Sequence, residues 1–229
     1  MKWISLAGAL LAACLAVAPA KARDALDILH GTLKAGAQPL VMEDGQTGGC
    51  SYWFVAITRD NVYRQGQYLR VTGYLSLLKT RSFLGATDTL APWSTTLNLV
   101  VDEASMGKDG NMHFTPSAPS QLYLLGAGGE SRPDKHSEPI STKTPGGLMM
   151  AIDADPALKI LKEATTSSHA ISVAFNQFYG DRMITVPIEL DVTTVKPNGE
   201  RVRSNETELD FSLCMLELVR EIPGALKAK

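Results

Sequence analysis

The stretch from residue 67 to residue 78 reads "QYLRVTGYLSLL", and its apolar residues alternate with mostly polar ones. Leu69, Val71, Leu75 and Leu77 fall on one side of an extended chain, because successive side chains of a strand point to opposite faces. This period of two predicts a β-strand with one buried and one solvent-facing side. Such strands are typical of antiparallel sheets.

Two neighbouring stretches extend this sheet. The residues "WSTTLNLVVD" at 93–102 repeat the alternation, whereas "SYWFVAIT" at 51–58 is apolar on both sides and is expected to be the most buried strand. We therefore predict a mainly β fold, either an antiparallel β-sandwich or a partly open β-barrel, with two or three short helices.

A tight turn is predicted near the C-terminal end of the sequence, within "RMITVPIELDVTTVKPNGERVRSNETELDFSL" at 182–213. Asn198 and Gly199 tolerate the positive φ angles that a two-residue hairpin loop requires. Pro187 cannot donate to a strand ladder, so its strand is expected to have a free edge. The register of such a hairpin would give three apolar pairs: Ile188 with Leu209, Val186 with Phe211, and Ile184 with Leu213.

The same register would place Glu189 opposite Glu208, and Asp191 opposite Glu206. Like charges directly opposed destabilise a sheet, so something should neutralise them. One interpretation is a bound calcium ion, which prefers several oxygen ligands. The other is a solvated face on which Arg203 or a lysine of a neighbouring strand supplies the opposite charge. These four carboxylates are a candidate acidic site.

Three stretches favour helices. The residues "DPALKILKEA" at 155–164 begin with Asp155 as a helix cap and Pro156 at the first helical position. Apolar residues at helical spacing also favour helices over 24–34 and 214–222. Where the chain changes from strand to helix near Cys214 is left open by the pattern.

Two connections are candidates for contacts with other molecules. Residues 126–147, "GAGGESRPDKHSEPISTKTPGG", are rich in glycine, proline and polar residues, which predicts one long polar loop. Such a loop either has a binding role or is a solvated connection without one. In "NQFYGD" at 176–181, Phe178 and Tyr179 would sit beside a glycine at a hairpin tip. There they could contact a partner, although packing is the ordinary role of such aromatics.

The N-terminal residues resemble a secretory signal peptide, because Lys2 precedes an apolar block that ends in small residues. Cleavage after Ala22 would remove residues 1–22 and leave 23–229 as a single β-rich domain in the periplasm or the medium. The alternative is "LAAC" at 11–14, where Cys14 would receive a lipid and tether a lipoprotein to a membrane surface. No later apolar stretch is long enough to span a bilayer.

Signal removal leaves two cysteines, Cys50 and Cys214. In an oxidising compartment two cysteines most simply form one disulfide. Neither cysteine has a CxxC partner or a histidine at ligand spacing, which argues against a metal site with two cysteine ligands. We therefore predict a disulfide that fastens the C-terminal segment to an early strand.

Charge and motifs exclude several classes of protein. After signal removal the chain has 20 basic and 24 acidic side chains, and there is no basic cluster of the kind that binds nucleic acid. The motifs of zinc proteases, serine hydrolases, phosphate loops and dinucleotide sites are missing. The histidines that remain, His30, His113, His136 and His169, are scattered. We expect no cofactor and no metal.

These features favour a non-enzymatic binding or assembly protein of the bacterial envelope, which acts on a protein partner or an envelope component through its loops or a free sheet edge. Two alternatives stay open. One is an extracytoplasmic hydrolase that uses Glu189, Asp191, Glu206 and Glu208. The other is a carrier with an apolar pocket for a small ligand.

Overall fold

The largest element of the fold is a seven-stranded antiparallel sheet. The computed structural model describes residues 25–42, 45–79, 93–133 and 138–220. The strand order is β1-β2-β3-β4-β9-β8, and β5 also pairs with β4. The bounds of its strands are β1 (Gly31–Val41), β2 (Thr47–Asp60), β3 (Gln67–Lys79), β4 (Trp93–Met106), β5 (Met112–Pro116), β8 (Ile140–Ser141) and β9 (Gly147–Ile152).

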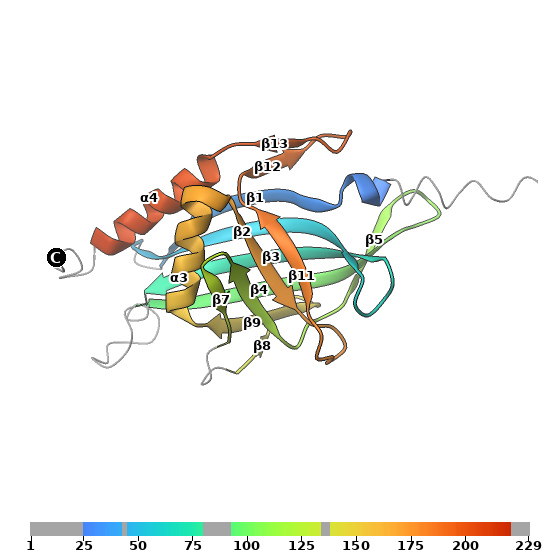
Figure 1. Cartoon of the computed structure of the whole chain (residues 1–229), viewed down its shortest axis with the longest axis horizontal. Helices are drawn as coiled ribbons and strands as arrows, with labels where there is room; N and C mark the ends of the chain where they lie inside the picture. Colours follow the sequence, from blue (N-terminus) through green and yellow to red (C-terminus); the bar gives the residue numbers. More distant parts are fainter. Residues whose placement is uncertain (1–24, 43–44, 80–92, 134–137, 221–229) are drawn as a thin grey trace, which may run out of the picture.

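A smaller antiparallel sheet has the order β11-β10-β6-β7 and crosses in front of the large sheet (Figure 1). A separate hairpin pairs β12 with β13. The two sheets are partly open and do not close into a barrel, and the prediction of a mainly β, antiparallel fold is confirmed. The bounds are β6 (Leu122–Gly126), β7 (Gly129–Ser131), β10 (Ala170–Phe175), β11 (Ile184–Glu189), β12 (Val192–Val195) and β13 (Arg201–Arg203).

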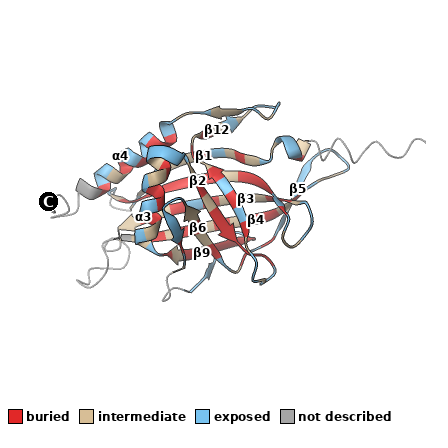
Figure 2. Cartoon of the chain, in the orientation of Figure 1, coloured by how far each residue is buried: buried red, intermediate tan, exposed pale blue. Residues whose placement is uncertain are grey.

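The apolar core lies between the two sheets, where the central strands are buried along much of their length (Figure 2). The four residues of β3 that alternation assigned to the inside are at most 1% exposed. In the segment 51–58 only Trp53 and Val55 fall short of full burial, as expected for a strand that is apolar on both faces. Burial of a large apolar side chain contributes about 1.5–3 kcal/mol, so this core supplies most of the drive to fold.

The turn at Asn198 and Gly199 forms, but the two-residue loop predicted for it is wrong. The connection spans Pro197, Asn198 and Gly199, the last with a φ of 85°. Lys196 donates its N–H to the carbonyl of Glu200 across the loop. A three-residue loop that ends in a glycine with positive φ is the next most common hairpin turn. It shifts the register by one residue.

The inward face of β11 was predicted correctly and its partner strand was not. Ile184, Val186 and Ile188 are buried, but they lie opposite residues of β10, for example Ile188 opposite Ile171. The expected partners, Leu209, Phe211 and Leu213, belong instead to helix α4 (Glu206–Arg220). Because β11 ends the small sheet, the free edge expected at Pro187 is present.

The helix predicted over 155–164 is α3 (Ala154–Glu163), which starts one residue earlier than Asp155 and has Asp153 at its cap position. It continues as a π-helical turn, η1 (Ala164–Ser168), and His169 ends it with a φ of 51°. Of the helix predicted over 214–222, residues 214–220 are helical as the last part of α4, and residues 221–222 lie outside the described part. Because α4 starts at Glu206, Cys214 and its neighbours in the chain on both sides are helical.

The helix expected over 24–34 is wrong beyond its first turn. Residues 25–28 are helical, and then Gly31, with a φ of 111°, opens strand β1. The expectation of one long polar loop over 126–147 is also wrong in part. That stretch contains β7 and β8, and Pro133 forms a bridge with Ile152, while residues 134–137 lie outside the described part.

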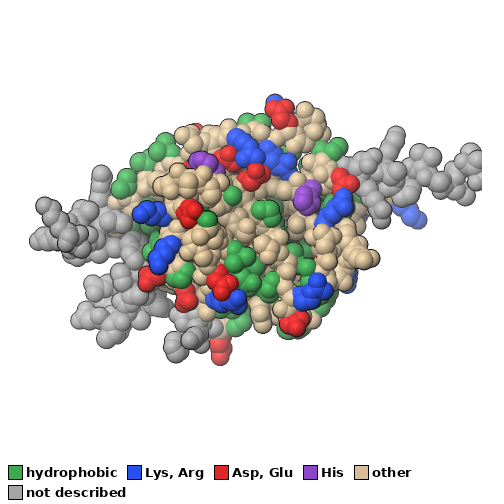
Figure 3. Space-filling model, viewed as in Figure 1, with side chains coloured by type: hydrophobic (Ala, Val, Ile, Leu, Met, Phe, Trp, Pro, Cys, Tyr) green, Lys and Arg blue, Asp and Glu red, His purple; other side chains and the backbone are tan. Residues whose placement is uncertain are grey.

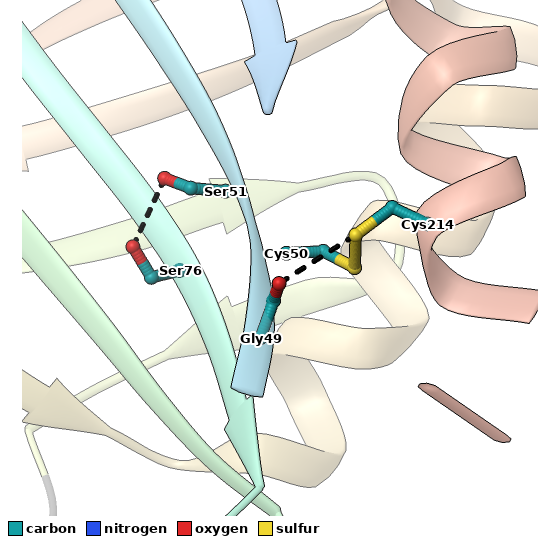
Figure 4. The surroundings of a disulfide bond; sticks show 5 residues. All are labelled: Gly49, Cys50, Ser51, Ser76 and Cys214. Carbon is teal, nitrogen blue, oxygen red and sulfur yellow. Dashed lines mark hydrogen bonds between the residues drawn. A yellow bond between two sulfur atoms is a disulfide. The ribbon is translucent and has the colours of Figure 1, made fainter. Parts of the chain in front are cut away.

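The predicted disulfide joins Cys50 of β2 to Cys214 of α4, with their Cα atoms 6.0 Å apart (Figure 4). The next residue of β2, Ser51, faces the other way and lies 3.0 Å from Ser76, oxygen to oxygen. Beside the disulfide the rings of Tyr52 and Phe211 stack with centroids 4.1 Å apart. Burial raises the pKa of Tyr52 above its usual range. The inner face of α4 is therefore fixed to β2 by covalent and aromatic contacts.

Candidate functional site

The structure does not bring the four predicted acidic residues together as opposed pairs. Glu189 and Asp191 both bind Arg203, at 2.5 Å and 2.7 Å. Glu206 and Glu208 lie in the first turn of α4. Among the described residues no group of three or more His, Cys, Asp or Glu could hold a metal ion. The like-charge pairing is thus wrong, and Arg203 supplies the charge that neutralises two of these carboxylates.

Glu208 makes a separate contact with His169. Its carboxylate is buried, and Oε1 lies 2.7 Å from Nδ1 of the half-exposed His169 ring. This contact joins the start of α4 to the end of η1. The pKa of His169 is raised above its ordinary value of 6.5, first by the hydrogen bond to Glu208 and then by the charge of that carboxylate.

Because the pKa of His169 is raised in the folded protein, the contribution of this ion pair to stability decreases as the pH rises. The folded protein holds the proton more tightly than the unfolded chain, so the ion pair stabilises the fold below about pH 6.5. This contribution is lost as the pH rises through the raised pKa. The variant His169→Asn keeps a residue that tolerates positive φ and removes the charge.

We expect the free energy of unfolding of wild type and His169→Asn to differ more in mildly acidic than in mildly alkaline buffer. The change in that difference should be about 1 kcal/mol or less, because half of the ring is in solvent. Urea unfolding at several pH values measures it. Parallel stability profiles for the two proteins would show that this pair does not link folding to pH.

The strongest candidate for a contact site is the loop between β10 and β11, residues 176–183. Asn176, which is fully buried, holds its base. Its Oδ1 accepts hydrogen bonds from the backbone N–H groups of Ser120 and Gln121, at 2.9 and 2.8 Å. Its Nδ2 donates to the carbonyl of Gly180, at 2.7 Å. One side chain therefore ties the start of this loop and Gly180 to the connection that leads directly into β6.

Phe178 and Tyr179 occupy the tip of this loop with φ angles of 53° and 55°. The left-handed conformation costs a residue other than glycine about 1–2 kcal/mol. Tyr179 is nevertheless 91% exposed, so burial of its ring does not hold it there, whereas the Phe178 ring is 50% exposed. Strained backbone of this kind is concentrated at functional sites.

The β2–β3 turn supports the tip from the side. The ring of Tyr63 meets Phe178 edge to face, with centroids 6.1 Å apart, and the Arg64 guanidinium lies 4.8 Å from the centre of the Phe178 ring. The Tyr63 hydroxyl donates to the carbonyl of Arg182. We call Tyr63, Arg64, Phe178 and Tyr179 the aromatic tip.

Sequence reasoning selected Phe178 and Tyr179 but missed Tyr63 and Arg64, which lie far away in the chain. One local signal was available. Asp60 is fully buried at the start of the β2–β3 turn, where its carboxylate accepts the N–H groups of the residues that follow, including those of Tyr63 and Arg64. An aspartate before a polar stretch is a common turn former. It predicts an ordered turn, although not which loop the turn will meet.

Comparison of the chain with protein-family models, curated proteins and solved structures finds no match. In the described part of the chain, no helix is both long and apolar enough to cross a bilayer. Among the described residues, the aromatic tip is the surface whose chemistry best suits a contact with another molecule.

Proposed function

We propose that this protein is exported to the bacterial envelope or the medium, where it acts as a non-enzymatic binding or assembly protein. Its contact with a protein partner is made through the aromatic tip. The observation that carries the proposal is the ring of Tyr179, which is almost wholly exposed on a strained backbone. Selection for folding alone would favour glycine at such a position.

The residue types of the tip suit a protein interface. Tyrosine and arginine are enriched among the residues that dominate binding energy, because they offer large contact areas together with hydrogen bonds. Asn176 and the Tyr63 hydroxyl fix the loop before binding, which lowers the entropy lost on association. The buried Cys50–Cys214 disulfide supports the proposed oxidising location.

Tyr179→Gly is expected to separate folding from binding. Glycine adopts positive φ without strain, so the free energy of unfolding should stay unchanged or rise by about 0.5–1 kcal/mol. Partner binding should fall, because the exposed ring is gone. Urea unfolding measures the first effect. A clear loss of stability would mean that the ring has a structural role, and the proposed contact would lose its main support.

Site-specific photo-crosslinking in cells tests the contact itself. A photoreactive residue at position 179 should give a discrete adduct, and the same residue at the exposed Lys108 should not. Extra wild-type protein should compete for the adduct, whereas extra Tyr179→Gly should not. Absence of an adduct, or equal adducts at both positions, would count against the proposal.

A separate measurement tests how the N-terminal end is processed. The mass of the mature protein distinguishes cleavage after Ala22 from a lipid on Cys14.

A further inference from the structure

Helix α4 is apolar on two opposite sides, of which the fold uses one. Phe211, Cys214 and Leu218 face inward and are at most 6% exposed. On the outer side three leucines remain open to solvent. Their exposed fractions are 55% for Leu209, 51% for Leu213 and 54% for Leu216.

The spacing of these leucines makes them one surface, which we call the leucine stripe. Steps of four and then three residues return to the same side of an α-helix, so the stripe runs for about 10 Å along α4. Hydrophobic side chains gather at the upper left of the molecule (Figure 3), where Figure 1 places α4. The disulfide at Cys214 holds the opposite side of the helix, so the stripe is presented at a fixed orientation.

Acidic residues run along one flank of the stripe. Glu206, Asp210 and Glu217 are all exposed, and helical spacing places them on the same side of the three leucines. On the other flank Ser212 is exposed and uncharged, and Glu208 is buried against His169. A surface of this kind is apolar along its centre and negative along one edge.

We propose that the leucine stripe docks a basic amphipathic helix of a partner protein. Such a helix would bury its own apolar face on the leucines and set lysine or arginine beside the acidic flank. The negative flank repels an anionic bilayer. It also opposes antiparallel pairing of two copies of α4, because that arrangement brings the same flank of each helix together. This surface is separate from the aromatic tip.

The probe is a synthetic helical peptide of about four turns, with leucines on one face and lysines along one flank. Its control replaces every lysine with glutamate. Titration into the oxidised full-length mature protein, followed by fluorescence anisotropy, should show binding of the basic peptide only. In the triple variant L209Q/L213Q/L216Q the affinity should fall about tenfold or more. The melting temperature should hardly change, because these side chains are exposed and glutamine is a good helix former.

A charge-reversed variant, D210K/E217K, is the matched control for the flank. It keeps the leucines, and Glu206 is left in place because acidic residues favour the first turn of a helix. This variant should lose affinity for the basic peptide and gain it for the acidic one. Equal binding of both peptides by wild type, or no binding of either, would overturn the proposal.

Two other possible occupants of the leucine stripe, a lipid surface and a second copy of this chain, would give distinct results. Binding to vesicles of phosphatidylglycerol that depends on the leucines would identify a lipid surface and reject the protein helix. A dimer of the wild type in sedimentation that the triple glutamine variant loses would identify a second copy of this chain, with the same consequence. Neither result bears on the crosslink at position 179, so the aromatic tip is tested independently.

Discussion

Replacement of both Cys50 and Cys214 with alanine is expected to lower the free energy of unfolding by about 2–5 kcal/mol. The bond joins residues that are 164 positions apart, so it restricts most of the unfolded chain. It also holds α4 against β2, where both cysteines are buried. Urea unfolding of the oxidised wild type and of the double variant measures the difference.

Reduction provides the control for this prediction. A thiol reductant should destabilise the wild type by a similar amount and leave the double variant unchanged. A loss below about 1 kcal/mol would indicate that the stack of Tyr52 on Phe211 and the other contacts of α4 hold the helix without the bond. Freely alkylated thiols in native protein would contradict the disulfide itself.

Asn176→Ala is expected to lower the free energy of unfolding by about 2–4 kcal/mol. The substitution leaves two backbone N–H groups and one carbonyl without the hydrogen bonds that Asn176 makes to them. The neighbour Gln177 offers a matched control. It is also fully buried, but its Oε1 has no partner in the described structure, and its Nε2 donates to Ser117. Gln177→Met should therefore cost only about 1 kcal/mol or less.

Thermal or urea unfolding of both variants gives the comparison directly. Equal losses for Asn176→Ala and Gln177→Met would mean that packing, and not hydrogen bonding, sets the energy of the loop base. The Asn176 variant should also lose the crosslink at position 179, because the tip would no longer be held. A retained crosslink would separate the order of the loop from its ability to bind.

The sequence predicted those parts of the fold in which one local pattern had one outcome. The alternation in β3 could be satisfied only by a strand with a buried face. The segment at Leu209 and Leu213 was ambiguous, because with Phe211 it alternates with period two, while the leucines alone also fit a helix. Asn205 followed three residues later by Glu208 is typical of a helix start, and this signal would have favoured the helix.

The candidate site was less predictable, because its parts come from distant segments. Phe178 and Tyr179 stood out locally, beside a glycine in a turn. Their support by Tyr63 and Arg64 depends on how the small sheet crosses the large one, and no local pattern determines that. The acidic pairing failed for the same reason: it assumed one hairpin where Glu189 and Glu208 belong to a strand and a helix.

The edge of the small sheet also affects how the protein behaves when it is concentrated. An unprotected edge strand can recruit the same strand of another molecule and seed aggregation. In β11 the exposed Pro187 offers no N–H to an incoming chain, and the N–H of Glu189 is already donated to Thr32. Two of the N–H positions at this edge are therefore closed to an incoming strand, which reduces its tendency to pair with the same edge of another copy.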